Sequence, residues 1–196
     1  MLIAIEGIDG AGKTTLARRL KEWLESKGHE AEVIKEPGDS EWGRKIRESY
    51  DRELDAREEL ELFLKDREEN VRSKILPALR REAIVIMDRY YYSTMAYQGA
   101  RGIDVEEIRR RNEEIAPKPD VVLLLDCEPE VCVERIKKRG KANRFERLEY
   151  LKKVREKFLE VAEKDERVRV IDASRGFEEV FEEAKAIVEE LLCTEV

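Results

Sequence analysis

A glycine-rich loop between an apolar segment and a helical one constrains this chain more than any other feature of its sequence. The segment LIAIE (2–6) is almost continuously hydrophobic, GIDGAGKT (7–14) follows at once, and Leu16, Leu20 and Leu24 then recur at helical spacing. The letters alone allow a chance match to G-x-x-x-x-G-K-[ST], but the motif also requires a strand before the loop and a helix after it. We therefore predict a phosphate-binding loop whose backbone N–H groups and following helix N-terminus face an anion.

Five short apolar segments have the nearly continuous hydrophobicity that is typical of buried parallel strands. They are 2–6, 31–35, 83–87, 121–125 and 168–171. Charged segments with helical periodicity separate them, and the last helical segment is expected to turn inward Phe177, Val180, Phe181, Ala184, Ile187, Val188 and Leu191. Alternating strands and helices predict an α/β fold of the P-loop NTPase type, in which helices cover both faces of a five-stranded parallel sheet. A length of 196 residues favours one domain, 1–196.

Composition limits the partners that the chain is expected to have. Its net charge of −7 gives no electrostatic help to nonspecific nucleic-acid binding. No apolar run approaches the roughly 20 residues that cross a membrane. Three cysteines without C-x-x-C spacing indicate reduced thiols in a cytoplasmic protein, and the lone His29 is expected at the surface between a helix and a strand. We therefore expect neither nucleic acid nor membrane as a partner.

Ligands of parallel α/β sheets bind beyond the carboxyl ends of the strands. In the loop at the first such position, Lys13 is expected to reach the β- and γ-phosphates of a nucleotide, and the Thr14 hydroxyl to bind Mg²⁺. The predicted nucleotide-binding set is Gly7, Ile8, Asp9, Gly10, Ala11, Gly12, Lys13, Thr14 and Thr15. A GTPase usually carries N-K-x-D after a later strand, whereas this chain has DCEPE (126–130) there, so ATP is favoured.

The stretch after the third strand carries groups suited to a second phosphate. Asp88 is expected to hold Mg²⁺ through water, and Arg89 adds a cation near the loop, which suits transfer between two phosphates. Four aromatic residues either wall a pocket or pack as ordinary amphipathic side chains; they are Tyr90, Tyr91, Tyr92 and Tyr97. Upstream, Phe63 and Arg67 lie four residues apart, hence on one helix face. The pair either clamps a nucleobase, by stacking and by hydrogen bonding, or consists of a core residue and a salt-bridge residue.

A basic stretch, ERIKKRGKANRFE (134–146), interrupts acidic surroundings. Its cations are Arg135, Lys137, Lys138, Arg139, Lys141 and Arg144. Because the loop 7–14 has no arginine, a short helical lid over 134–146 is expected to supply positive charge to a transferred phosphoryl group and to exclude water. The alternative is a solvated helix face without a partner.

Taken in order, these blocks resemble the thymidylate kinase family along essentially the whole chain. The resemblance rests on IEGIDGAGKTTL, EPG, LFLKDR…ILPAL, DRYYYSTMAYQG and RIKKRGKANRFE, whose order and spacing are more specific than any single block. It implies an ATP- and Mg²⁺-dependent phosphotransferase that converts dTMP to dTDP in dTTP biosynthesis, as a homodimer. Two alternatives stay open: a P-loop kinase for another deoxynucleotide or a deoxynucleoside, and a nucleotide-dependent switch ATPase.

The resemblance also implies roles for individual residues. Asp9 is expected between the two substrates, Phe63 stacks on thymine, and Arg67 donates to the edge of the base. Arg89 binds the dTMP phosphate, and Tyr97 crowds a ribose 2′-hydroxyl. The implied substrate-binding set is Asp9, Glu36, Arg47, Phe63, Arg67, Arg89, Ser93, Tyr97 and Gln98. The implied catalytic set is Asp9, Lys13, Arg89, Arg139 and Arg144.

On the ATP side, the resemblance implies that Arg135 contacts the nucleotide, that residues 173–175 hold adenine, and that the lid arginines follow the bacterial arrangement. The chain departs from the family at two positions. Asp39 replaces a common glycine in the segment EPGDS (36–40), where an acid would weaken the binding of the acceptor phosphate, require a metal, or point away. Asn70 stands where many relatives carry histidine.

Overall fold

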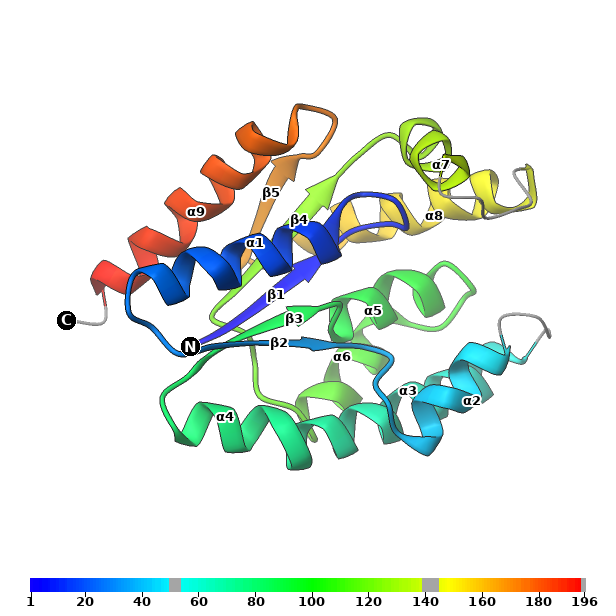
Figure 1. Ribbon diagram of the computed structural model, residues 1–196. Helices are drawn as coiled ribbons and strands as arrows, with labels where there is room; N and C mark the ends of the chain where they lie inside the picture. The colour runs from blue at the N-terminus through cyan, green and yellow to red at the C-terminus, as the bar shows by residue number, and fades with distance from the viewer. Residues whose placement is uncertain (50–53, 139–144, 195–196) are drawn as a thin grey trace.

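The computed structural model describes residues 1–49, 54–138 and 145–194, and it contains a five-stranded parallel sheet at its centre (Figure 1). The strand order is β2-β3-β1-β4-β5, and every pair is parallel. The strands are β1 (Leu2–Glu6), β2 (Ala31–Lys35), β3 (Ile84–Asp88), β4 (Val121–Asp126) and β5 (Val168–Asp172). All five predicted strands are confirmed, with ends that differ by at most one residue.

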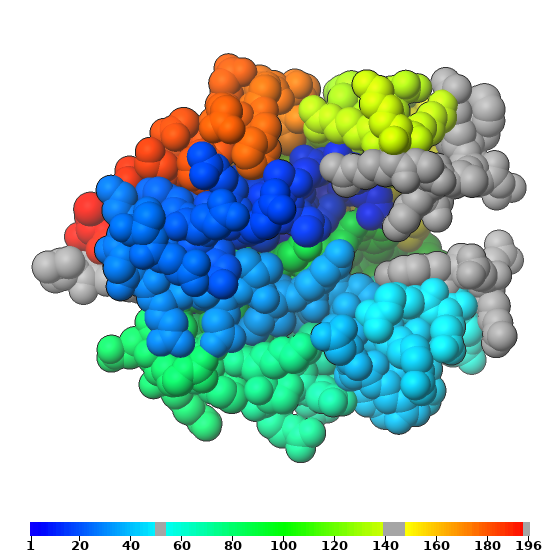
Figure 2. All heavy atoms as spheres, viewed as in Figure 1, coloured from blue at the N-terminus to red at the C-terminus, as the bar shows by residue number. Residues whose placement is uncertain are grey.

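Helices cover both faces of the sheet, as predicted. On one face α1 and α9 pack against each other, and on the other α5 packs against α8 (Figure 1). The space-filling view looks onto the first of these faces, where α9 lies along α1 (Figure 2). The helices are α1 (Lys13–Ser26), α2 (Glu41–Ser49), α3 (Ala56–Asn70), the π-helical turn η1 (Val71–Ile75), α4 (Leu76–Arg80), α5 (Tyr91–Gly99), α6 (Val105–Glu113), α7 (Pro129–Lys137), α8 (Phe145–Ala162) and α9 (Phe177–Thr194).

Burial along the strands follows their position in the sheet. Every residue of β1 and β3 is buried, as are the first five residues of β4, which continuous hydrophobicity predicts. The same prediction is wrong for β2 and β5, because they are the two edge strands and part of each faces solvent. Val33 is 38% exposed and Val170 is 46% exposed.

The residues after the end of α1 lie as predicted, whereas the aromatic residue at the start of α9 does not. Gly28 adopts φ +89° just after α1, and His29 is exposed between α1 and β2, as predicted. The expectation that Phe177 lies on the inner face of α9 is wrong, since its side chain is 37% exposed at the first position of the helix. Its ring instead stacks on Phe181, with centroids 6.5 Å apart.

The carboxyl ends of the central strands bring the candidate residues together. Ile5 of β1 pairs with Asp88 of β3, so the loop after β1 lies beside Arg89. The part of the chain that the structure describes contains no helix long and apolar enough to cross a membrane.

Candidate functional site

The loop after β1 has the backbone conformation that its glycines allow. Gly7, Gly10 and Gly12 have φ values of +138°, +90° and +102°, in the region that L side chains rarely adopt. A Cβ atom on Gly7 would lie 2.5 Å from the carbonyl oxygen of Leu125, and one on Gly10 would lie 2.5 Å from that of Cys132. The glycines are therefore needed both for the path of the loop and for its contact with β4 and α7.

Lys13 lies inside this loop at the first position of α1. Its ammonium group donates to the carbonyl oxygens of Gly7 and Ile8, at 2.9 and 2.8 Å. Burial, together with the nearby charge of Arg89, lowers the pKa of Lys13 to about 8. The first N–H groups of a helix have no intrahelical partner, so α1 and the ammonium group form one anion site.

Thr14 and Asp88 form the pair of oxygen ligands that a magnesium ion would use. The Thr14 hydroxyl donates to Asp88 Oδ2 at 2.6 Å, and the Lys35 ammonium group lies 3.9 Å from that oxygen. Mg²⁺ prefers oxygen ligands and usually keeps several waters and substrate phosphates, so two protein oxygens beside a phosphate loop fit it. Among the described residues, no three His, Cys, Asp or Glu side chains cluster as a self-sufficient metal site.

Asp9 connects the phosphate loop to the residues that follow β3. Its carboxylate lies 2.7 Å from Arg89 Nη2, and the Tyr97 hydroxyl donates to it at 3.2 Å. Partial loss of hydration opposes the ionisation of Asp9, whose side chain is still 57% exposed, but the charges of Arg89 and Lys13 outweigh that effect and lower its pKa to about 2. The Arg89 guanidinium also lies over the Tyr97 ring, 5.2 Å from its centroid. The structure thus joins the two predicted phosphate sites through one ionised carboxylate.

Glu6, a buried acidic residue at the end of β1, accepts hydrogen bonds from residues next to Arg89. Glu6 Oε1 accepts from the backbone N–H groups of Tyr90 and Ser93, at 2.8 and 3.2 Å. The Ser93 hydroxyl donates to Glu6 Oε2 and accepts from Arg89 Nη1 at 3.1 Å. Burial raises the pKa of Glu6 to about 7, against the lowering effect of these partners. Ser93, a predicted pocket residue, therefore links Glu6 to Arg89.

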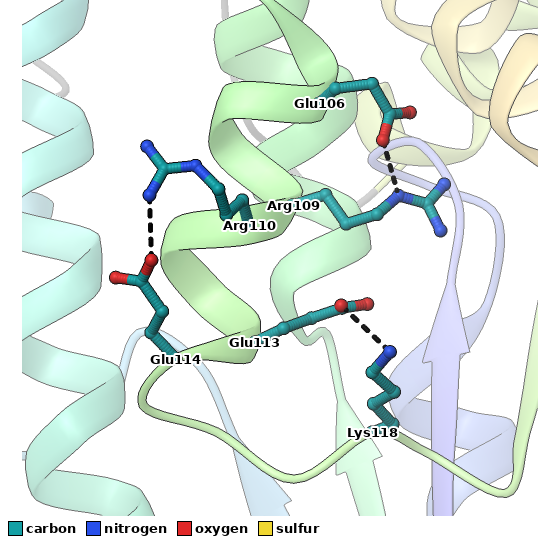
Figure 3. A pocket seen from close by; sticks show the side chains of 6 residues that line it. All are labelled: Glu106, Arg109, Arg110, Glu113, Glu114 and Lys118. Atoms are coloured by element: carbon teal, nitrogen blue, oxygen red, sulfur yellow. Dashed lines mark hydrogen bonds and ion pairs between the residues drawn. The ribbon is translucent and has the colours of Figure 1, made fainter.

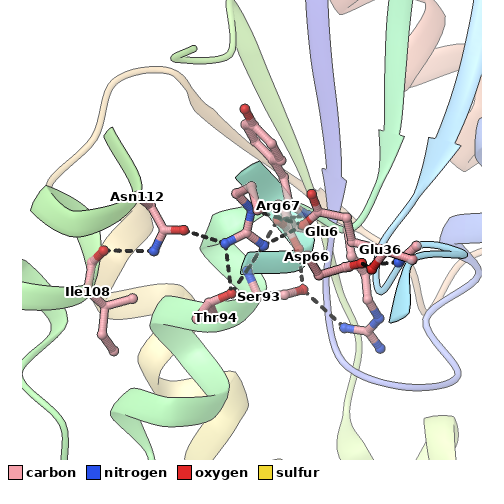
Figure 4. Close-up of polar contacts among 12 residues, drawn as sticks. Glu6, Glu36, Asp66, Arg67, Ser93, Thr94, Ile108 and Asn112 are labelled. Atoms are coloured by element: carbon pink, nitrogen blue, oxygen red, sulfur yellow. Dashed lines mark hydrogen bonds and ion pairs between the residues drawn. The ribbon is translucent and has the colours of Figure 1, made fainter. Parts of the chain in front are cut away.

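Arg67 is 1% exposed and is enclosed by polar side chains from three other segments (Figure 4). Its Nε atom donates to Glu36 Oε2 at 3.0 Å, and Nη2 donates to the same oxygen. Nη1 donates to Asn112 Oδ1, and both Nη atoms lie 3.3 Å from Thr94 Oγ1. The guanidinium also lies over the Tyr90 ring at 5.4 Å. The core salt bridge, one of the two predicted alternatives, is present in this side chain, and a role as donor to a base stays a prediction.

The segment after β2 forms a braced turn. Arg47 Nη1 donates to the carbonyl oxygen of Gly38 at 2.8 Å, and Asp66 accepts from the Gly38 N–H at 2.7 Å. Asp39 has a side chain that is 95% exposed and 3.6 Å from Lys74, so of its three predicted outcomes the structure favours pointing away. Asn70 is buried, and its amide lies where a Cβ atom on Gly38 would be.

Other predicted pocket residues lie on α3 and α5. Phe63 is half-buried on α3, one turn before Arg67. Gln98 is buried, and its amide donates to Glu59 at 2.8 Å, so its role at a nucleoside pocket stays a prediction. Tyr90, just before α5, and Tyr91 and Tyr92 at its start are fully buried, so the packing alternative applies to these three tyrosines. For Tyr97, which is only partly buried, the pocket-wall role stays a prediction.

The structure describes only part of the basic segment. Arg135 lies on α7, and its Nη1 atom lies 3.7 Å from Cys127 Sγ. Arg139 and Arg144, with residues 139–144 of the predicted lid, lie outside the described residues. In the loop predicted to bind adenine, the backbone N–H of Ala173 donates to the backbone carbonyl oxygen of Asp126, at the end of β4, at 2.7 Å.

A depression of about 480 Å³ on α6 is separate from this site (Figure 3). Its lining carries three acids and three cations, which pair as Glu106 with Arg109, Arg110 with Glu114 and Glu113 with Lys118. Because the charges compensate one another, the depression offers no net charge to a phosphate ligand.

Sequence reasoning missed four side chains that hold the site together: Glu6, Asp66, Thr94 and Asn112. Glu6 is the last residue of β1, so an inspection of strand ends would have found it. Thr94 directly follows Ser93, a predicted pocket residue. Asn112 lies on α6, outside every motif, and only the folded structure brings it to Arg67.

Comparisons with known proteins agree with this geometry. The sequence model of the thymidylate kinase family matches residues 5–184. A probable thymidylate kinase of Archaeoglobus fulgidus is 58% identical over 192 residues, covering 98% of this chain and 96% of the relative. Thymidylate kinases of Xanthomonas oryzae pv. oryzae (48% identical, 96% and 82% covered) and Xylella fastidiosa (45%, 98% and 92%) are also similar. With this likeness running through the loop, the strand ends and the helices that carry the site, the chain belongs to the thymidylate kinase family.

Proposed function

We propose that this protein transfers the γ-phosphoryl group of ATP to dTMP and releases dTDP and ADP. The observation that carries the proposal is the ion pair of 2.7 Å between Asp9 of the phosphate loop and Arg89 after β3. This pair supports the proposal because a cation suited to an acceptor phosphate lies beside a loop suited to donor phosphates, and transfer between two phosphates requires the two close together.

The two substrates would occupy opposite sides of this ion pair. Residues Gly7–Thr15 would hold the ATP phosphates, with Lys13 leaving the carbonyl oxygens of the loop to reach the β- and γ-phosphates. Phe63 would stack on the thymine, and Arg67 would donate to its edge. Because arginine only donates hydrogen bonds, that edge must present an acceptor, as the carbonyl oxygens of thymine do, and an amino group there would oppose a donor with a donor.

Mg²⁺ is assigned to Thr14 and Asp88, directly or through water, together with phosphate oxygens of ATP. When bound, the ion would neutralise negative charge on the β- and γ-phosphates. The remaining cations come from the protein itself: Lys13 and Arg89, with Arg139 and Arg144 assigned to the lid.

The chemistry needs positioning and positive charge more than a general base. A phosphate monoester has its second pKa near 6, so near neutral pH the dTMP phosphate oxygen is already a nucleophile. That oxygen attacks the γ-phosphorus in line, the bond to the β-phosphate oxygen breaks, and ADP leaves. Asp9, ionised beside Arg89, would hold that arginine at the acceptor phosphate.

We also propose, by family resemblance, that residues 1–196 act as a single kinase domain with a lid over 134–146, in a cytoplasmic homodimer. The net charge of −7 supports the expectation that nucleic acid is not a partner.

A coupled ADP-release assay over a panel of acceptors tests the function. The panel contains dTMP, dUMP, dCMP, dAMP, dGMP and thymidine, and dTMP is expected to give the highest kcat/KM. Lys13→Met should reduce turnover by at least about 100-fold, as loss of a transition-state cation does, with an unchanged circular dichroism spectrum.

A higher kcat/KM for thymidine or another monophosphate would replace dTMP as the acceptor. ATP hydrolysis without phosphotransfer to any acceptor would favour the switch ATPase. A Lys13→Met variant with the wild-type rate would remove the loop from the mechanism.

A further inference from the structure

Asn112 is a fully buried polar residue that no motif contains. It lies on α6, 45 residues from Arg67 in sequence, and is 0% exposed. Its amide nitrogen donates to the carbonyl oxygen of Ile108 at 2.8 Å, within the same helix. With the nitrogen held in this way, the oxygen is directed at Arg67 Nη1 (Figure 4).

The five N–H groups of Arg67 have a clear division of partners. Glu36 accepts hydrogen bonds from Nε and Nη2, and Asn112 accepts one from Nη1. These two residues therefore fix the plane of the guanidinium. The two remaining contacts are both with Thr94 Oγ1, and both are long, at 3.3 Å. A single hydroxyl at that distance is a weak acceptor, so the Thr94 side is where an acceptor oxygen of a ligand gains most.

The neutrality of Asn112 matters as much as its position. Glu36 already supplies one negative charge to Arg67 in a buried site, where pairing is required. A second carboxylate at position 112 would add a negative charge that repels Glu36. An apolar side chain there would leave one N–H of the Arg67 guanidinium unpaired. An amide satisfies that N–H and leaves the charge of the pair unchanged.

We propose that Asn112 is a positioning residue that orients Arg67 toward the acceptor base and so helps to select a base with an oxygen, rather than an amino group, at that edge. The inference rests on the proposed function, because it assigns Arg67 to the acceptor pocket. It adds α6 to the elements that determine specificity.

The test compares Asn112→Leu, which keeps the branched shape but has no acceptor, with Ile108→Ala, which loosens the same helix but keeps the backbone carbonyl that holds Asn112. For Asn112→Leu we expect KM for dTMP to rise about tenfold, the factor that corresponds to about 1.4 kcal/mol. The KM for ATP and kcat should stay within about twofold of wild type, and the preference for dTMP over dCMP should fall. Ile108→Ala should lower the melting temperature without changing that preference.

Equal changes in KM for dTMP in both variants, or a wild-type KM and preference in Asn112→Leu, would overturn the inference. If Asn112→Leu does not fold, Asn112→Ala at reduced temperature gives the same comparison. The wild-type panel is measured first, so failure of the function is seen separately: a wild-type enzyme that ignores dTMP refutes the function, whereas a dTMP kinase whose KM and preference survive the substitution refutes only the role of Asn112.

Discussion

Arg89 adopts a left-handed backbone conformation, φ +74°, directly after β3. Such a conformation is uncommon for a residue with a long side chain and is kept only where the surroundings enforce it. Here the Arg89 N–H donates to the carbonyl oxygen of Ile5, and the next N–H, that of Tyr90, donates to Glu6. The backbone turns sharply at this point, and the turn directs the guanidinium across to Asp9.

Phe63 provides the direct test of the acceptor pocket at residue scale. Base stacking on an aromatic ring contributes about 1–3 kcal/mol, so Phe63→Ala should raise KM for dTMP by about 5-fold or more and leave KM for ATP nearly unchanged. Steady-state kinetics with each substrate varied in turn would measure both. Leu62→Ala, at the neighbouring half-buried position of α3, is the matched control. Equal effects on the two KM values would remove Phe63 from the pocket.

Glu6 should make the stability of the fold depend on pH. Burial raises its pKa from an ordinary value near 4.5 to about 7, so between these values the folded state holds a proton that the unfolded state has released. This contribution is therefore complete below about pH 4.5 and is lost as the pH rises through about 7. Its size is at most roughly 3 kcal/mol, because each tenfold difference in proton affinity between the folded and unfolded states corresponds to about 1.4 kcal/mol.

The Glu6→Gln variant lacks this titration. Its free energy of unfolding, measured by urea denaturation from about pH 5 to about pH 8, should fall less with rising pH than that of the wild type. Glu163→Gln, at an exposed position, should behave as the wild type does. Parallel curves for wild type and Glu6→Gln would contradict the assignment.

At the scale of elements, α2 lies so close to the turn after β2 that a glycine is needed at the contact. A Cβ atom on Gly43 of α2 would lie 2.1 Å from the carbonyl oxygen of Gly38 and 2.9 Å from Asp66 Oδ1. Asp66 of α3 in turn accepts from the Gly38 N–H. Two helices therefore hold the turn that begins at Glu36, the partner of Arg67.

Gly43→Ala should push α2 away from that turn. Overpacking of this kind costs about 1–3 kcal/mol, so a lower melting temperature is expected, together with a higher KM for dTMP. Gly176→Ala is the control, because the nearest atom to its new methyl group is the end of the flexible Glu179 side chain, at 3.2 Å. Wild-type stability and KM in Gly43→Ala would show that the turn tolerates the displacement.

At the scale of the whole molecule, the strands and the phosphate loop could be predicted because their signals are local. Hydrophobic runs marked all five strands, and the glycines with Lys13 marked the loop. The partial exposure of β2 and β5 could not be predicted, because strand order decides which strands lie at the edges. The contact of Asn112 was missed for the same reason, because it depends on which helix the fold brings beside Arg67. The spacing of Phe63 and Arg67 suggested a clamp for a base, whereas the role of Gln98 came from resemblance alone.

The strand order also has a consequence for biosynthesis. β1 pairs with β3 and β4, so a chain leaving the ribosome from its N-terminus holds the phosphate loop long before it holds either neighbour of the strand that carries it. The carbonyl group of Cys132, against which Gly10 lies, is made later still. The phosphate loop is thus synthesised before the strands and the helix that surround it, and its apolar strand has no neighbour to pair with until β3 has been made.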